Sequence, residues 1–249
     1  MGVRRSLVAV ATLAALAAAP AELSATTGEP SAAGDDHALE ALLAELPSKE
    51  EEENTVTNRY RRDLVEYCRA RGCSDLTAVE VGCFRGYTTA VLSRLFGRVF
   101  VLDNDAGHLA AARARSRGCT NLVFLRVQLY SALERFDWSE LLAENDVHVA
   151  VVDAGHWHRQ VASDIQSALS LPLVDTLIFD DYGLIRDVRR AVDAHVEAGT
   201  LECRPIGEEL PRLLRAPAVA EAARYWNQGP PDGDPELREG QLCSVRARG

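Results

Sequence analysis

From residue 77 onward, short apolar runs alternate with longer amphipathic stretches along the chain. The apolar runs have the length of buried strands, and the stretches between them carry apolar residues at helical spacing. Strands that alternate with helices in this way predict an α/β fold with a parallel, doubly wound sheet. The expected strands are residues 78–81, 98–102, 122–127, 146–152, 175–179, 201–205 and 241–247, and the expected helices are residues 90–96, 107–117, 131–144, 161–171, 184–198 and 217–226.

The first 25 residues have the pattern of a targeting segment. Arg4 and Arg5 precede an apolar run at residues 7–19, which is short for a membrane span, and small residues follow it. We expect a secretory signal peptide that is absent from the mature protein, which then resides in the secretory pathway or is secreted. An organelle transit peptide, leading to an organelle lumen, is the first alternative, and myristoylation of Gly2 is the second.

Between this segment and the alternating region, the sequence predicts a linker and two helices. Residues 26–56 comprise a Gly/Ser/Ala/Pro-rich linker, a short amphipathic helix at 37–46 and an acidic run at 48–54 that we expect to be solvated. A helix at residues 57–71 either covers a ligand site as a lid or packs against the sheet. The main domain is expected to begin at residue 57 and to extend to residue 249.

Charge and hydrophobic content limit the partners. The 249 residues are 47% hydrophobic, which is enough for a core, and carry a formal charge of -10 without a Lys/Arg-rich patch. Such a surface argues against nucleic acid and against an anionic membrane as the main partner. We therefore expect a small-molecule substrate and no stable membrane insertion, and the sequence leaves the oligomeric state open.

Six cysteines are scattered along the chain without a Cys-x-x-Cys pair, which argues against a zinc site. An even number of cysteines allows disulfides in a secreted protein. Cys68 and Cys73, which flank the end of the expected helix 57–71, are the best candidates for such a bond.

The most informative motif is Glu80-x-Gly82-x-x-x-Gly86, at the turn from the first strand to the first helix. Its glycines let the backbone approach a ligand, and the helix N-terminus offers unpaired N–H groups. The spacing differs from the Gly-x-Gly-x-x-Gly fingerprint that holds a dinucleotide pyrophosphate. A carboxylate near the turn suits a ligand with a cationic amino acid end, although a chance glutamate in an ordinary strand–helix turn is the simpler alternative. The second strand ends at Asp103. Its distance along the chain from Glu80 is close to that expected between a nucleotide-binding turn and an acid that binds two ribose hydroxyls.

This motif resembles the first motif of the class I S-adenosylmethionine-dependent methyltransferases. The resemblance implies a Rossmann-like, mostly parallel seven-stranded sheet with helices on both faces and an antiparallel C-terminal hairpin. It also implies S-adenosyl-L-methionine as cofactor and a methyltransferase domain at residues 57–249. The implied cofactor-binding residues are Glu80, Gly82, Gly86, Asp103 and Gln128.

Acidic residues also follow the fourth and fifth strands, at Asp153, Asp180 and Asp181. The carboxyl ends of neighbouring parallel strands lie together, so these carboxylates should converge and need a cation such as Mg²⁺. This part resembles small-molecule O-methyltransferases with an Asp-Asp-Tyr-Gly motif, several subgroups of which bind a metal through the three matching acids. A second acid, the base in some relatives, is replaced here by Gly155, which makes His156 the nearest candidate base.

Together these features predict an S-adenosylmethionine-dependent methyltransferase that methylates a hydroxyl group of a small molecule. His156 and Asp153 are the expected catalytic residues, and Asp153, Asp180 and Asp181 are the expected metal ligands. Other functions remain open: a catalytically inactive cofactor-binding Rossmann domain and an NAD-dependent oxidoreductase, and beyond these a non-catalytic sugar-binding or structural Rossmann domain and a metal-assisted hydrolase. The missing third glycine argues against the oxidoreductase.

Overall fold

The computed structural model describes residues 32–52, 54–130, 137–229, 231 and 234–246. The expected targeting segment at residues 1–25 lies outside the described residues, as does the first part of the expected helix 131–144. Among the described residues, no helix is long and apolar enough to cross a membrane.

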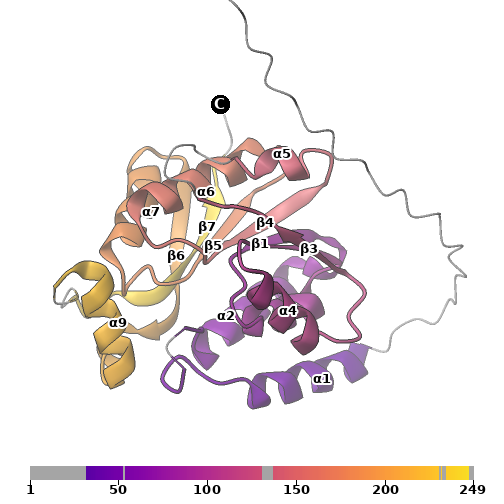
Figure 1. Cartoon of the computed structure of the whole chain (residues 1–249), viewed down its shortest axis with the longest axis horizontal. Helices are drawn as coiled ribbons and strands as arrows, with labels where there is room; N and C mark the ends of the chain where they lie inside the picture. Colours follow the sequence, from indigo (N-terminus) through magenta and orange to yellow (C-terminus); the bar gives the residue numbers. More distant parts are fainter. Residues whose placement is uncertain (1–31, 53, 131–136, 230, 232–233, 247–249) are drawn as a thin grey trace, which may run out of the picture.

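A single seven-stranded sheet forms the centre of the molecule, with the strand order β3-β2-β1-β4-β5-β7-β6 (Figure 1). The pairs among β1 to β5 are parallel, whereas β7 is antiparallel to both of its neighbours, β5 and β6. This topology confirms the predicted Rossmann-like fold with its antiparallel C-terminal hairpin. The strands are β1 (Thr77–Val81), β2 (Arg98–Asp103), β3 (Leu122–Arg126), β4 (Val147–Val152), β5 (Thr176–Phe179), β6 (Leu201–Glu209) and β7 (Arg238–Val245).

Helices cover both faces of the sheet, as predicted. Those that precede β3 pack on one face and those that follow it pack on the other, so two separate hydrophobic clusters form. The first group is α1 (Ala32–Glu45), α2 (Asn58–Arg71), the 3-10 helix η1 (Cys73–Asp75), α3 (Tyr87–Leu95) and α4 (Ala106–Arg115). The second group is α5 (Ser139–Leu142), α6 (His158–Ser170), α7 (Arg186–Glu197), α8 (Leu210–Leu213) and α9 (Pro217–Asn227).

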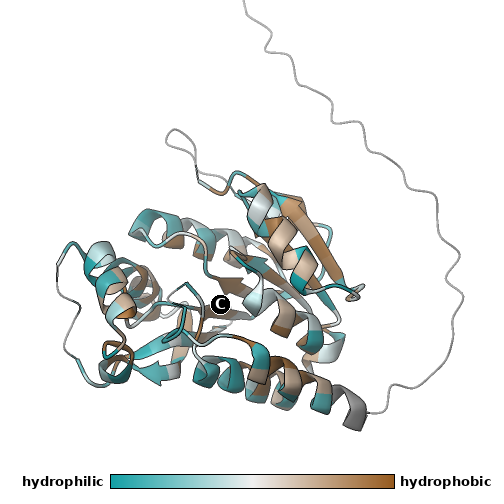
Figure 2. Cartoon of the chain, turned by 60° about the horizontal axis from the view of Figure 1, so that its bottom comes forward, coloured by the Kyte–Doolittle hydropathy of each residue, from teal (hydrophilic) through white to brown (hydrophobic). Residues whose placement is uncertain are grey.

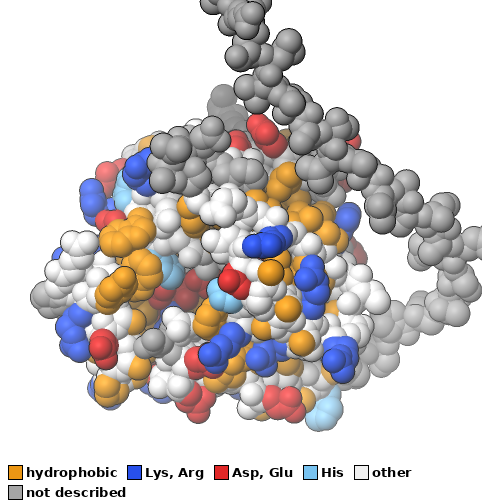
Figure 3. All heavy atoms as spheres, viewed as in Figure 1, with side chains coloured by type: hydrophobic (Ala, Val, Ile, Leu, Met, Phe, Trp, Pro, Cys, Tyr) orange, Lys and Arg blue, Asp and Glu red, His pale blue; other side chains and the backbone are white. Residues whose placement is uncertain are grey.

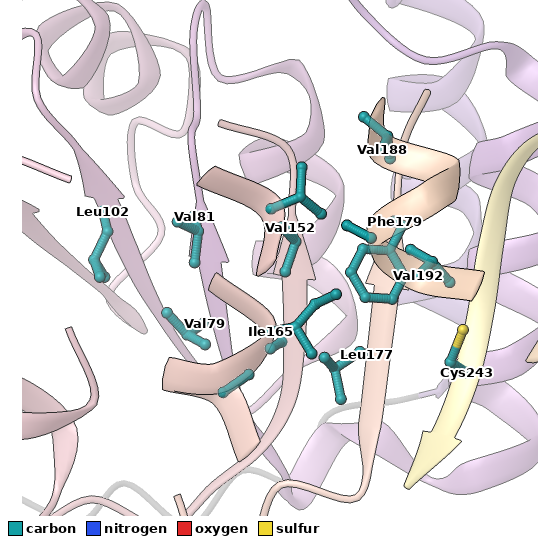
Figure 4. Close-up of a cluster of buried hydrophobic side chains, with 14 of the residues drawn as sticks. Val79, Val81, Leu102, Val152, Ile165, Leu177, Phe179, Val188, Val192 and Cys243 are labelled. Atoms are coloured by element: carbon teal, nitrogen blue, oxygen red, sulfur yellow. The ribbon is translucent and has the colours of Figure 1, made fainter. Parts of the chain in front are cut away.

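The alternation of side chains along each strand supplies both clusters. Val79 and Val81 of β1 enter the cluster beneath α5 to α9, whereas Ala78 enters the one beneath α1 to α4. Figure 4 shows the first of these clusters, in which strand side chains such as Leu177 meet Ile165 from α6. Figure 2 shows the matching outer surface, where polar residues follow the outward sides of the helices. The sheet is therefore fixed from both sides, and the ends of its strands have defined positions.

Two local predictions are wrong. The acidic run at residues 48–54 is not fully solvated, because the side chain of Lys49 is only 2% exposed. The disulfide joins Cys203 of β6 to Cys243 of β7, which face each other in the strand register, while Cys68 and Cys73 are free thiols.

Candidate active site

A cavity of about 340 Å³ opens at the carboxyl ends of β1, β4 and β5. Parallel α/β sheets bind ligands at this edge because the turns after the strands meet there. One part of the wall comes from the turns after β1 and β2, and another comes from α9 and from the start of α7. Figure 3 shows a hollow on this face with acidic side chains inside it and hydrophobic side chains beside it.

The turn after β1 is shaped by two glycines with positive φ angles, Gly82 at 88° and Gly86 at 76°. A Cβ atom on Gly82 would lie 2.3 Å from the carbonyl oxygen of Asp153, so only glycine lets β1 and β4 approach at their ends. A Cβ atom on Gly86 would lie 2.4 Å from the Cα atom of Ala112 in α4. Gly82 lines the cavity, whereas Gly86 does not and instead lets α3 pack closely on α4.

Asp103, at the end of β2, lines the cavity and also holds the glycine turn. Its Oδ2 atom accepts hydrogen bonds from the backbone N–H groups of Cys83 at 3.0 Å and Phe84 at 3.3 Å. Its Oδ1 atom accepts a 2.8 Å bond from the N–H group of Asp105. This acid therefore joins the two turns that border one part of the cavity.

Gln128 does not line the cavity. Its side-chain amide is exposed and donates a 2.8 Å hydrogen bond to the carbonyl oxygen of Tyr130. The next two residues, Leu129 and Tyr130, line the cavity in its place.

Glu80 does not line the cavity either. Its side chain is buried and accepts a 2.5 Å hydrogen bond from the hydroxyl group of Thr89 in α3. Burial, followed by the negative charges of Asp153 and Asp103, raises the pKa of Glu80 to about 8. The carboxyl group therefore lies beneath the glycine turn and is protonated near neutral pH.

The raised pKa predicts a pH-dependent cost to stability. In the unfolded chain Glu80 loses its proton near pH ~4.3, so folding is disfavoured as the pH rises from there to about 8. We expect Glu80→Gln, which keeps the acceptor for Thr89, to remove this cost. The gain in the free energy of unfolding should be small at pH 5 and reach at most about 5 kcal/mol at pH 9.

Urea titrations at the two pH values measure this gain. The control is Glu66→Gln, which replaces an exposed glutamate of α2 and should change stability little at either pH. An equal gain for Glu80→Gln at both pH values contradicts a proton held by the buried carboxyl group.

The three predicted metal ligands meet at the ends of β4 and β5, but in unequal environments. Two of them, Asp153 and Asp181, form a group with His156 in which each residue places one ligand atom within 4.8 Å of the others. Asp180 is buried more deeply, and one of its oxygen atoms, Oδ1, has no hydrogen-bond partner among the described residues. Asp181 has a positive φ angle of 57°, which is strained for a non-glycine residue.

The cation beside these acids is a lysine that the sequence analysis missed. The Nζ atom of Lys49 lies 2.9 Å from Oδ2 of Asp180 and 2.7 Å from Oδ1 of Asp181. It also lies 3.6 Å from Oε1 of Glu239 in β7, a second residue that was missed. Burial alone would discharge the ammonium group, but the three carboxylates outweigh it and raise the pKa of Lys49 well above its usual value. One signal was available in the sequence, because Lys49 is the only lysine in the chain.

His156 lies between the acids and the cavity. Its Nε2 atom is 3.3 Å from Oδ2 of Asp181 and 3.8 Å from Oδ1 of Asp153, and its ring makes a T-shaped contact with Trp226 of α9. Burial disfavours a charged imidazole, but these two carboxylates outweigh it and raise the pKa of His156. The side chain is thus placed to accept a proton and to hold it beside two anions.

The structure also explains why a glycine is needed at position 155. A Cβ atom on Gly155 would lie 2.6 Å from Oε1 of Gln160 and 2.7 Å from the ring of Tyr130. The Tyr130 hydroxyl group accepts a 3.0 Å hydrogen bond from the N–H group of Gly155 and donates one to Asp164 of α6. Tyr130 and Gln160 thus fill the space that a side chain at position 155 would need.

Residues 79–182 match a family model described as "Methyltransferase domain". No curated protein matches the sequence. Among solved structures, an O-methyltransferase from Bacillus cereus in complex with SAH is similar at a TM-score of 0.53 and 15% identity, over 88% of this chain and 92% of that chain. The N-methyltransferase NodS from Bradyrhizobium japonicum, in complex with S-adenosyl-L-homocysteine, has a TM-score of 0.46 and 14% identity, over 86% of this chain and 99% of that chain.

At 15% identity the O-methyltransferase structure shows the fold alone, and the family match adds the activity. The match covers Gly82, Asp103 and the acids after β4 and β5, which are among the residues that border the cavity. The prediction of a methyltransferase is therefore confirmed: the chain carries a methyltransferase domain of Rossmann-like fold.

Proposed function

We propose that the chain transfers the methyl group of S-adenosylmethionine to a hydroxyl group of a small, apolar or aromatic molecule, with His156 as the base. The observation that carries this proposal is the position of His156, a largely buried imidazole on the cavity wall whose Nε2 atom lies 3.3 Å from Asp181 and 3.8 Å from Asp153. This imidazole borders the cavity between the glycine turn and the apolar wall.

The donor half of the cavity suits a cationic cofactor. The backbone at Gly82 lies open to the cavity, and Asp103 and Asn104 border the same region. S-adenosylmethionine carries a sulfonium and an ammonium charge, which the surrounding carboxylates favour. The two other predicted cofactor residues, Glu80 and Gly86, would act indirectly by shaping the turn, and Gln128 lies outside the cavity wall.

The acceptor half is apolar. It is formed by α9 together with the segment that leads into α7, and its wall includes Trp226, which makes a T-shaped ring contact with the base. Trp157 also borders the cavity, is 41% exposed and makes a T-shaped ring contact with Trp226. Such a wall favours a flat or apolar acceptor. The apolar residues of this half are Leu184, Ile185, Val219, Ala222, Ala223 and Trp226.

In this reaction the acceptor oxygen attacks the methyl carbon of the sulfonium. An oxygen–carbon bond forms as the carbon–sulfur bond breaks, and the sulfur keeps the electron pair to give S-adenosylhomocysteine. The hydroxyl proton passes to Nε2 of His156, where Asp181 and Asp153 stabilise the resulting imidazolium. The enzyme otherwise acts by aligning the two substrates in the cavity.

Cofactor binding is the first test. We expect the purified chain to bind S-adenosylmethionine or S-adenosylhomocysteine with a dissociation constant in the micromolar range, on the order of 1–100 μM by calorimetry. Gly82→Ala should abolish binding because its Cβ atom would clash with the end of β4. Cys83→Ser is the matched control in the same turn, and circular dichroism checks that both variants fold. Binding of NAD in place of either ligand contradicts the proposal.

Turnover is the second test, measured as methyl transfer from labelled cofactor to a metabolite extract. His156→Ala should lower the rate roughly 10²-fold or more, and Asp181→Asn should lower it by a similar factor. Cofactor binding should survive in both variants, because neither group belongs to the donor half. Asp175→Asn is the control, since this partly exposed acid precedes β5 at the opposite edge of the sheet. Cofactor binding without turnover in the unmodified chain supports the inactive alternative instead.

Processing and compartment form a third test. We propose that residues 1–25 are removed and that the protein matures in an oxidising compartment, an idea that the Cys203–Cys243 disulfide supports. Intact mass spectrometry of protein from its native cells should find a chain that begins near residue 26 with one disulfide. A chain that retains Met1 or a myristoylated Gly2, or one with all six thiols reduced, contradicts it.

A further inference from the structure

The acids at the ends of β4 and β5 share a cation supplied by a distant part of the chain. Lys49 comes from the segment between α1 and α2, 131 residues before Asp180. Its ammonium group donates hydrogen bonds to Asp180 and Asp181, and it pairs with Glu239 at 3.6 Å. The lysine side chain is 2% exposed and Asp180 is 5% exposed, so water screens these contacts little.

The segment that carries Lys49 is fixed on both sides. Arg61 of α2 donates hydrogen bonds to the carbonyl oxygen of Pro47 at 2.7 Å and to the hydroxyl group of Thr55 at 2.9 Å. The N–H group of Thr57 donates a 2.8 Å bond to Glu239, and the Thr57 hydroxyl group donates a further bond to the same carboxylate. Lys49 is therefore held in place by its own segment as well as by its ion pairs.

The contacts of Lys49 determine whether Asp153, Asp180 and Asp181 can bind the divalent cation that the sequence predicts. Such a cation would take oxygen atoms from Asp153, Asp180 and Asp181 together. In the structure, Oδ2 of Asp180 and Oδ1 of Asp181 already face the lysine ammonium group. A metal held by the remaining group of Asp153, His156 and Asp181 would share Asp181 with a buried ammonium group, and the two cations would repel each other. The donor set therefore does not fit a divalent cation well.

We propose that Lys49 is the resident cation of this site and a positioning residue for the base. The ammonium group holds one oxygen atom of Asp181, whose other oxygen atom faces Nε2 of His156 at 3.3 Å. This pairing keeps Asp181 in its strained backbone conformation and directs its charge at the imidazole. The positioning role rests on the proposed function of His156, whereas the exclusion of a metal does not.

The chemistry of lysine suits this place better than that of arginine. An ammonium group is a compact point charge with three donors, and here it contacts three carboxylates from two strand ends. The planar guanidinium group of arginine pairs instead with one carboxylate in two parallel bonds. In a sequence with 27 Lys and Arg residues, the only lysine occupies this position.

The test is the binding of Mn²⁺ to the purified chain, measured by electron paramagnetic resonance of the free ion. The unmodified chain should show no site of submillimolar affinity, that is, none tighter than about 1 mM. Lys49→Met keeps most of the side-chain volume and removes the charge, and it should bind one Mn²⁺ at least about tenfold more tightly. Adding Asp181→Asn to this variant should abolish the gain, and Lys49→Arg, which keeps the charge, should show no gain.

Stoichiometric Mn²⁺ binding by the unmodified chain overturns the proposal, as does a folded Lys49→Met variant without any gain. If Lys49→Met does not fold, the unmodified chain decides between the outcomes through its Mn²⁺ titration and its methyl transfer in excess EDTA. An unchanged rate in EDTA supports Lys49 as the resident cation, and a lost rate that Mn²⁺ restores overturns it. The Mn²⁺ titration also separates failures, because it needs neither an acceptor nor methyl transfer and so does not depend on His156 acting as the base.

Discussion

The ion pairs of Lys49 determine how the site is arranged. Three buried carboxylates, from Asp180, Asp181 and Glu239, surround one ammonium group, and each would be costly to bury without it. The same contacts attach the segment before α2 to the ends of β5 and β7, so the N-terminal part of the chain helps to build the cavity wall. Asn54, a few residues further on, lines the cavity directly.

The fold could be predicted because it follows from local patterns. Apolar runs and helical spacing are properties of neighbouring residues, and they placed the strands and most helices within a few residues of their observed bounds. The strand ends were predictable for the same reason, since Gly82, Asp103 and Asp153 directly follow or end apolar runs. A parallel sheet then brings those ends to one edge without any further information.

The remaining parts of the site depend on contacts between distant residues. Lys49 meets an acid 131 positions away, and the partner of Cys203 follows from the register of β6 on β7. The role of Gly155 is visible only once the ring of Tyr130 lies over it. Whether the helix at residues 57–71 covers the site or packs on the sheet also depends on distant contacts. In the structure α2 packs against the sheet through Tyr60 and Leu64, whereas α9 borders the cavity. None of these relations has a periodic signature in the sequence.

The most direct measurement is a crystal structure of the chain with S-adenosylhomocysteine, soaked in Mn²⁺ and recorded at the manganese absorption edge. An anomalous difference map reports whether a metal ion lies among the acids after β4 and β5, independently of any assay. Our account predicts density for the ammonium group of Lys49 between Asp180 and Asp181, no manganese peak there, and cofactor over the glycine turn. A strong manganese peak beside Asp153 and Asp181, with Lys49 turned away, would contradict it.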